Sequence, residues 1–249
     1  MEREFKADAL IFDIDGVLLD VTGSFPEVIR QAVSTGWERF CGGASDVPGY
    51  NAGHERVLKR HGAFNDDYDI AWTLLSMAAA SGEKLLSRAL PSPERLLSEL
   101  ESYRAPVPQW VTARYGSLVP RPEVRALCAE LYGGKGCGLH LLERPMIQKH
   151  WRELGLPVAI YSGRNGLEWE LAKDSLGWND FPDELIIHSD SGITKPSPEG
   201  LEILCRRLGV SSPVFFGDTA SDMQAQAAFG KGRFAAVGPL LPEAEFFGE

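Results

Sequence analysis

The sequence of 249 residues contains only four cysteines, and none of them forms a C-x-x-C pair. This spacing indicates neither a structural zinc site nor a disulfide framework, and it favours a reducing, cytoplasmic setting. The five histidines form no H-x-x-x-H pair, so they predict no metal site of their own.

Long apolar runs are also missing. No run approaches the ~20 residues of a membrane-spanning helix, and residues 1–6 lack the apolar stretch of a signal peptide. The formal net charge of -10 disfavours nucleic acid and anionic membranes as partners. Two phosphate-binding patterns, G-x-x-x-x-G-K-S/T and G-x-G-x-x-G, do not occur. We therefore expect a cytoplasmic monomer or homodimer that binds a small molecule.

Short apolar runs, in contrast, recur in two separate parts of the chain. The expected strands are residues 9–12, 156–161, 185–187, 214–216 and 234–237. From the second strand on, helical patterns alternate with strands, which predicts a parallel sheet. Residues 22–142 are almost purely helical in pattern. The prediction is an α/β fold with a doubly wound parallel sheet (1–21 and 143–249), interrupted after its first strand by a helical domain (22–142).

Helix boundaries are indicated by capping residues. Ser24 and Glu27 have the spacing of a capping box, and Ser92 precedes a proline in the first helical turn. Pro145 is expected to open a helix that ends at Leu154. Further helices are expected near 55–60, 65–81, 121–131, 166–176 and 198–208, and one that contains Met223, Ala227 and Ala228 runs toward Gly230.

The first strand runs directly into two carboxylates, Asp13 and Asp15, followed by Gly16. Open α/β sheets place their chemistry at the carboxyl ends of strands. In an extended segment the side chains of residues i and i+2 share a face, so both carboxylates can point into one site. Their mutual repulsion predicts a bound Mg²⁺ or a perturbed proton. A simple Asp-Gly turn is the alternative.

Other polar residues follow the remaining strands. Ser162 follows the second strand, and Lys195 lies in the loop after the third. The fourth strand is followed by Asp218, with Asp222 beyond it. Together these residues supply a nucleophile, an acid, a hydroxyl group, a cation and hard oxygen ligands of the kind that Mg²⁺ prefers.

This ordered set resembles the haloacid dehalogenase superfamily of Mg²⁺-dependent phosphohydrolases. The four matching motifs are Asp13-Ile14-Asp15-Gly16-Val17, Tyr161-Ser162-Gly163-Arg164, Lys195-Pro196 and Gly217-Asp218-Thr219-Ala220-Ser221-Asp222. The helical insert looks like the type 1 cap of that superfamily. The core is similar to that of phosphoglycolate phosphatases, but the insert differs from theirs in length and pattern, so their substrate is not transferred.

The resemblance implies a role for each motif residue. Asp13 would attack phosphorus, and Asp15 would act as general acid and then as general base. Ser162, Gly163 and Lys195 would hold the phosphoryl oxygens. Mg²⁺ would be held by Asp13, the backbone carbonyl of Asp15, and Asp218. Asp222, which completes the metal group, would orient Lys195 or a metal-bound water.

Several alternatives stay open at this point. Arg164 is predicted to contact the substrate or, alternatively, to form a surface salt bridge. The implied activity is hydrolysis of a small phosphorylated metabolite through an aspartyl-phosphate. A phosphosugar mutase would instead return the phosphoryl group to its product. A phosphonatase would need a Schiff-base lysine, for which Lys59 is the nearest candidate. A binding protein on the same fold is the alternative without catalysis.

Overall fold

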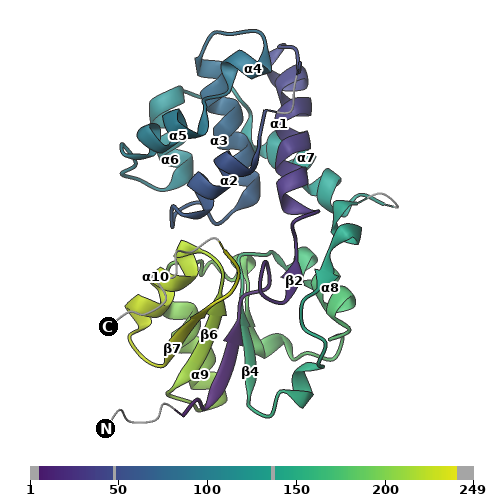
Figure 1. Ribbon diagram of the computed structural model, residues 1–249, viewed down its shortest axis with the longest axis vertical. Helices are drawn as coiled ribbons and strands as arrows, with labels where there is room; N and C mark the ends of the chain where they lie inside the picture. Colours follow the sequence, from purple (N-terminus) through teal and green to yellow (C-terminus); the bar gives the residue numbers. More distant parts are fainter. Residues whose placement is uncertain (1–5, 47–48, 136–137, 240–249) are drawn as a thin grey trace. The chain divides into compact units, whose positions relative to one another are not determined.

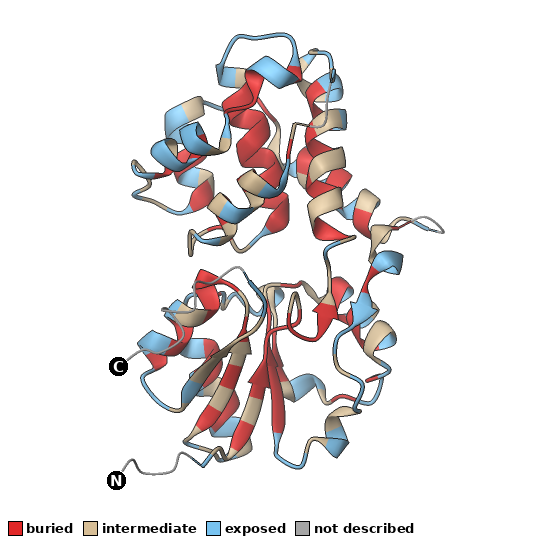
Figure 2. Ribbon diagram, in the orientation of Figure 1, coloured by how far each residue is buried: buried red, intermediate tan, exposed pale blue. Residues whose placement is uncertain are grey.

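A computed structural model describes residues 6–46, 49–135 and 138–239. The chain forms two compact units, one made of residues 1–21 and 143–249 and the other of residues 22–142. Each unit has its own interior, as the buried segments of Figure 2 show.

The first unit is built on a five-stranded parallel sheet (Figure 1). Its strands, in sheet order, are β5 (Ile186–Ile187), β4 (Val158–Tyr161), β1 (Ala9–Phe12), β6 (Pro213–Gly217) and β7 (Arg233–Ala236). The chain winds outward from β1 in both directions, so the predicted doubly wound sheet is confirmed. The carboxyl end of β1 is therefore flanked by those of β4 and β6, the position where such sheets bind ligands.

Helices cover both faces of this sheet because successive side chains of each strand point to opposite sides. Val158 and Ile160 of β4 pack in the same cluster as Trp169 of α8 (Gly166–Leu176). Ala159 and Tyr161 join a second cluster with residues of α9 (Glu199–Leu208) and α10 (Ala220–Phe229). Strands with two buried faces carry nearly continuous apolar sequence, which is why the pattern predicted them well.

The expected helix from Pro145 to Leu154 is wrong. Pro145 belongs to β3 (Arg144–Pro145), which pairs antiparallel with β2 (Leu19–Asp20). The segment then forms only one 3₁₀ turn, η2 (Trp151–Glu153), capped by His150. Two further 3₁₀ turns in this unit are η3 (Asp183–Leu185) and η4 (Ser189–Ser191). Pairing with a distant strand outweighs the local helical pattern here.

The second unit is a bundle centred on α3 (Asp67–Ala80), whose residues 67–78 are all buried. Helices α1 (Phe25–Cys41), α6 (Val107–Tyr115) and α7 (Arg121–Gly133) pack against α3. Completing the unit are α2 (Ala52–Lys59), α4 (Leu86–Ala89), α5 (Pro93–Leu100) and η1 (Leu139–Leu142). No helix among the described residues is long and apolar enough to cross a membrane.

Two of the predicted helix starts have different outcomes. The Ser92 side chain accepts a hydrogen bond from the backbone N–H of Arg95, which confirms its capping role. The capping box at Ser24 is wrong, because that side chain does not cap α1. Glu27 accepts hydrogen bonds from Arg30 and Gln31 on the next turn instead. A side-chain cation one turn away competes for the carboxylate that a capping box requires.

Candidate active site

Asp13 lies at the first turn after β1 and is only 4% exposed. Its backbone N–H donates to the carbonyl oxygen of Phe216 in β6, at 2.9 Å. The chain then folds back on itself, because Leu18 and Leu19 both donate their backbone N–H to the carbonyl oxygen of Ile14. The tight loop keeps Asp13 in the sheet and turns the following residues out of it.

Lys195 joins the loop after β5 to the end of β1. Its Nζ lies 2.9 Å from Oδ1 of Asp13 in an ion pair and donates to Oδ1 of Asp222 at 2.6 Å. The lysine and both carboxylates are almost fully buried. A buried ammonium needs such partners, since burial of an unpaired charge is strongly unfavourable. Residues far apart in the sequence thus form one charged cluster.

Asp222 also holds the start of α10. Its Oδ2 accepts hydrogen bonds from the backbone N–H of Thr219 at 3.0 Å and from the Thr219 hydroxyl at 2.5 Å. A Cβ added to Gly217 would lie 2.4 Å from the Cβ of Asp222, so only glycine permits this approach. Asp222 is therefore positioned by its own helix cap as well as by Lys195.

The carboxylates form a group that suits a hard cation. One oxygen from each of Asp13, Asp218 and Asp222 lies within 4.8 Å of the other two, and all three residues are buried. Mg²⁺ prefers a few carboxylate oxygens and retains several waters. Both oxygens of Asp222 already accept hydrogen bonds, one from Lys195 and the other from Thr219, which makes Asp222 the least suited of the three as a direct ligand. The donor set fits the predicted metal.

The charges of this cluster shift its protonation. Burial raises the pKa of Asp13 from 3.8 to about 7, although the attraction of Lys195 lowers it, and Asp222 and Asp15 raise it further. Burial also lowers the pKa of Lys195, but the attraction of Asp13 and Asp222 outweighs burial and holds it above its usual value. The lysine stays protonated, and the carboxylates together outnumber it. A bound cation would relieve this imbalance.

This imbalance predicts how stability depends on pH in protein treated with EDTA. Folded protein keeps the Asp13 proton up to a pKa of about 7, whereas the unfolded chain releases it near 3.8. The unfolded state binds fewer protons between these values, so stability falls as pH rises through this window. Asp13→Asn removes that component and should reduce the drop in Tm between about pH 5 and about pH 7.5 by several degrees. Thermal unfolding followed by circular dichroism measures the difference, and equal drops in both proteins would contradict it.

Gly16 brings the loop after β1 against Asp218. It has a φ of +69°, and an added Cβ would lie 2.4 Å from Oδ2 of Asp218. Gly16→Ala should displace this carboxylate, weaken Mg²⁺ binding about tenfold and destabilise the protein by about 1–3 kcal/mol. Gly177→Ala is the matched control, since Gly177 has a φ of +68° with no atom near its added Cβ. Titration calorimetry with Mg²⁺ should show weaker binding only in Gly16→Ala.

Ser162 follows β4 beside the end of β1. Its backbone N–H donates to Ile187 at 3.0 Å, and its Oγ accepts a hydrogen bond from the backbone N–H of Arg164 at 3.2 Å. Ser162 is 1% exposed, and Gly163 next to it is partly exposed. The fold thus places this serine at the sheet edge that carries Asp13, as the strand pattern indicates.

Arg164 is fully buried, so its interpretation as a surface salt bridge is wrong. Its guanidinium donates two hydrogen bonds to Oδ1 of Asp15, at 2.9 and 2.7 Å, and one to Oε2 of Glu143 at 3.0 Å. Glu143 was not among the sequence candidates. Nothing in its local sequence marks it, because its partner Arg164 is 21 residues away.

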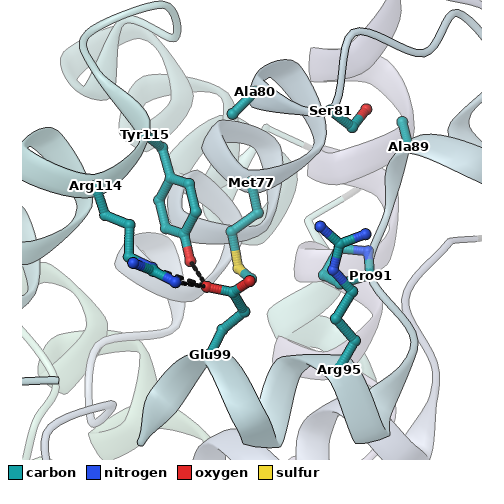
Figure 3. Close-up of a pocket in the computed structure, with 9 residues that line it drawn as sticks. All are labelled: Met77, Ala80, Ser81, Ala89, Pro91, Arg95, Glu99, Arg114 and Tyr115. Atoms are coloured by element: carbon teal, nitrogen blue, oxygen red, sulfur yellow. Dashed lines mark hydrogen bonds and ion pairs between the residues drawn. The ribbon is translucent and has the colours of Figure 1, made fainter. Parts of the chain in front are cut away.

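The helical unit contains a pocket of its own, drawn in Figure 3. Both Arg114 and Tyr115 contact the carboxylate of Glu99, at 2.6 Å and 3.1 Å respectively, and Arg95 lines the pocket as well. None of the motif residues lines this pocket, so we assign it no part in the chemistry. Lys59, the Schiff-base candidate, forms an ion pair with Asp67 at 2.8 Å. Its Nζ is therefore engaged by a carboxylate of the same helical unit.

The sequence model of the haloacid dehalogenase-like hydrolases matches residues 7–230. The chain belongs to this family. A match over almost the whole chain confirms the resemblance inferred from the four motifs.

Several solved structures are similar to this hydrolase. Phosphatase Tt82 from Thermococcus thioreducens is 26% identical, with 92% of this chain and 91% of that chain covered and a TM-score of 0.64. A Lactobacillus plantarum protein provisionally named a phosphoglycolate phosphatase is 18% identical, covers 94% and 87%, and has a TM-score of 0.55. CbbY from Rhodobacter sphaeroides, solved with xylulose-(1,5)bisphosphate, is 17% identical, covers 94% and 88%, and has a TM-score of 0.53. The last two show the shared fold alone. No curated protein matches the chain.

Proposed function

We propose that this hydrolase is a Mg²⁺-dependent phosphatase that acts on a small phosphorylated metabolite. The observation that carries the proposal is the buried contact of Lys195 with both Asp13 and Asp222. A lysine beside an acidic cluster at the end of a central strand can balance a phosphoryl group that arrives there. The similarity to a protein named phosphatase Tt82 supports the same activity.

In the proposed reaction, the Asp13 carboxylate attacks phosphorus while the bond from phosphorus to the ester oxygen breaks. Asp15 gives its proton to the departing oxygen, and an aspartyl-phosphate remains on Asp13. Asp15 then removes a proton from water as the water oxygen attacks phosphorus. Cleavage of the acyl phosphate regenerates the Asp13 carboxylate and releases inorganic phosphate.

The remaining side chains bind and orient. The Ser162 hydroxyl and the backbone N–H of Gly163 would donate to phosphoryl oxygens, and Lys195 would balance their charge. Asp13 and Asp218, with the backbone carbonyl of Asp15, would hold Mg²⁺. When bound, Mg²⁺ would supply positive charge that offsets the repulsion between the carboxylates and the phosphate.

Release of phosphate from p-nitrophenyl phosphate, with and without EDTA, tests the activity. A panel of phosphorylated metabolites then identifies the preferred ester. Measuring both free phosphate and isomerised product distinguishes a phosphatase from a mutase, because a mutase returns the phosphoryl group to its product. Failure to release phosphate from any of these esters in the presence of Mg²⁺ would overturn the proposal.

We further propose that the helical unit is a cap that selects the substrate. A pocket within it lies beside Thr22 and Leu142, where the chain enters and leaves the unit, and is lined also by Tyr50 and Glu55. The Tyr50 side chain is buried, and its hydroxyl has no hydrogen-bond partner among the described residues. Burial raises the pKa of Glu55. The partly exposed carboxyl group of Glu55 suits recognition of a hydroxyl-bearing leaving group.

Glu55→Gln should therefore lower kcat/KM for the preferred metabolite about tenfold, since a lost polar contact discriminates between esters. It should leave p-nitrophenyl phosphate within about twofold of wild type, because that ester offers no hydroxyl group to the pocket. Glu83→Gln is the control, since Glu83 is exposed and does not line the pocket. An equal loss on both substrates would contradict a selective role.

A further inference from the structure

The buried guanidinium of Arg164 contacts residues of the first unit that are far apart in the sequence. It contacts the carboxylates of Asp15 and Glu143, and its Nη1 donates to the carbonyl oxygen of Glu168 at 3.2 Å. The side chains of Arg164 and Glu143 are both 0% exposed, whereas that of Asp15 is 25% exposed. Asp15 is therefore held from the protein interior while part of it remains accessible.

The geometry of the contact restricts Asp15. The Nε and Nη2 atoms of Arg164 both donate to the same oxygen, Oδ1. Two donors fixed in one planar group constrain the direction of the carboxylate more than a single flexible donor would. An acid or base must be held close to its productive orientation, because small misplacements strongly reduce proton transfer.

Glu143 in turn holds Arg164. It accepts a hydrogen bond from Nη2, the same nitrogen that donates to Asp15. If Arg164 lost the carboxylate of Glu143, this rotamer would be less favourable, because a positive charge in the interior must be paired. Arg164 also donates its backbone N–H to Oγ of Ser162, a contact that does not depend on the guanidinium.

We propose that Arg164 is a positioning residue for Asp15, and that Glu143 fixes the arginine in the orientation this requires. The inference rests on the proposed function, in which Asp15 transfers the proton to and from the reacting oxygens. Arg164 does not itself need to touch the substrate. Substitution of Arg164 should therefore reduce the hydrolysis rate most for substrates whose leaving group needs a proton.

Phenyl phosphate and p-nitrophenyl phosphate test this dependence on proton transfer, because the two esters are close in shape but differ in the leaving group. Phenolate, with a pKa of about 10, is a poor leaving group that needs the acid, whereas p-nitrophenolate departs readily without it. The parameter to compare is kcat/KM, which covers the steps up to departure of the leaving group. Asp15→Asn and Arg164→Gln should each lower kcat/KM for phenyl phosphate about 10²-fold, and for p-nitrophenyl phosphate less than about fivefold.

Arg164→Gln leaves Glu143 buried without its partner and can fail to fold. The double variant Arg164→Gln/Glu143→Gln removes both charges and should show the same selective loss on phenyl phosphate. Arg164→Lys keeps the charge with a single donor group, and should recover part of the activity. Arg152→Met is the matched control, since Arg152 is exposed and pairs with Asp180. It should behave as wild type on both esters.

The outcomes separate the two proposals. Combining Asp15→Asn with the double variant should cause no further loss if the arginine acts through Asp15. Equal losses on both esters, or wild-type kcat/KM in the folded double variant, would overturn the positioning role while leaving the phosphatase in place. If wild type releases no phosphate from any ester tested, the proposed function fails and this inference falls with it. If Asp15→Asn cleaves phenyl phosphate normally, Asp15 is not the acid, and the positioning role fails while the phosphatase activity stands.

Discussion

Asp13→Asn should lower phosphate-ester hydrolysis by about 10⁴-fold or more, which is the scale of losing a catalytic nucleophile. Asparagine keeps the size of the side chain but lacks the negative charge that attacks phosphorus. The loss should appear in kcat with p-nitrophenyl phosphate and with any preferred metabolite alike, because every ester would pass through the same aspartyl-phosphate. Steady-state rates and the release of inorganic phosphate measure it.

The control for this variant is Asp174→Asn, an exposed residue of α8, which should keep wild-type activity. Circular dichroism should show that Asp13→Asn is folded. The variant removes one of several crowded carboxylates, so relief of their repulsion predicts a Tm at neutral pH no lower than that of wild type in EDTA. A folded variant with near wild-type turnover would show that Asp13 is not the nucleophile.

Removal of metal should abolish activity, and addition of Mg²⁺ should restore it. Asp218→Asn should raise the Mg²⁺ concentration for half-maximal activity by about 10²-fold, because an anionic oxygen is replaced by a neutral one. Binding can be measured without turnover, since Mg²⁺ that binds only the folded state raises its Tm. Wild type should show this increase, and Asp218→Asn should need far more Mg²⁺ to show it.

Ca²⁺ should inhibit. Its looser and higher coordination could engage both oxygens of Asp13 and hold back the attacking one. Asp174→Asn again serves as the control for a lost carboxylate, and its Mg²⁺ requirement should match that of wild type. Full activity in thorough EDTA treatment, or an unchanged Mg²⁺ requirement in Asp218→Asn, would contradict a metal site at these residues.

Much of the site could be predicted because its signals are local. A buried parallel strand leaves a continuous apolar run, and the residue after it lies at the sheet edge where ligands bind. This reasoning found Asp13, Ser162 and Asp218 from three separate strands. It also found Lys195, which lies in a loop, through its place in the motif order. The structure brings Lys195 into contact with Asp13 and Asp222.

The role of Arg164 could not be predicted in the same way. Its partners Asp15 and Glu143 lie 149 and 21 residues away in the chain. A sequence pattern marks an arginine as charged, but only the fold determines that its side chain is buried. Burial determines what the contact does, because an exposed ion pair contributes little to stability whereas a buried ion pair constrains the positions of both side chains.

The prediction of a helix beginning at Pro145 was wrong for a related reason. Its apolar residues have helical spacing, but Arg144 and Pro145 pair with β2, more than a hundred residues earlier. Trp151 then donates its ring N–H to the carboxylate of Asp180, which helps hold the irregular segment in place. Propensity within a short window cannot register partners so far away in sequence.

Asp222 has a double use that bears on how this protein could lose its activity by mutation. One of its oxygens anchors Lys195, while the other caps α10 through Thr219. A mutation at Asp222 would damage folding together with catalysis, whereas one at Asp13 need not destabilise the protein. A descendant released from selection for turnover, but still selected for a stable fold, should therefore lose Asp13 first and retain Asp222. In such a descendant, an intact Asp222 would reflect common descent and the stability of α10, and it would not indicate that the protein is active.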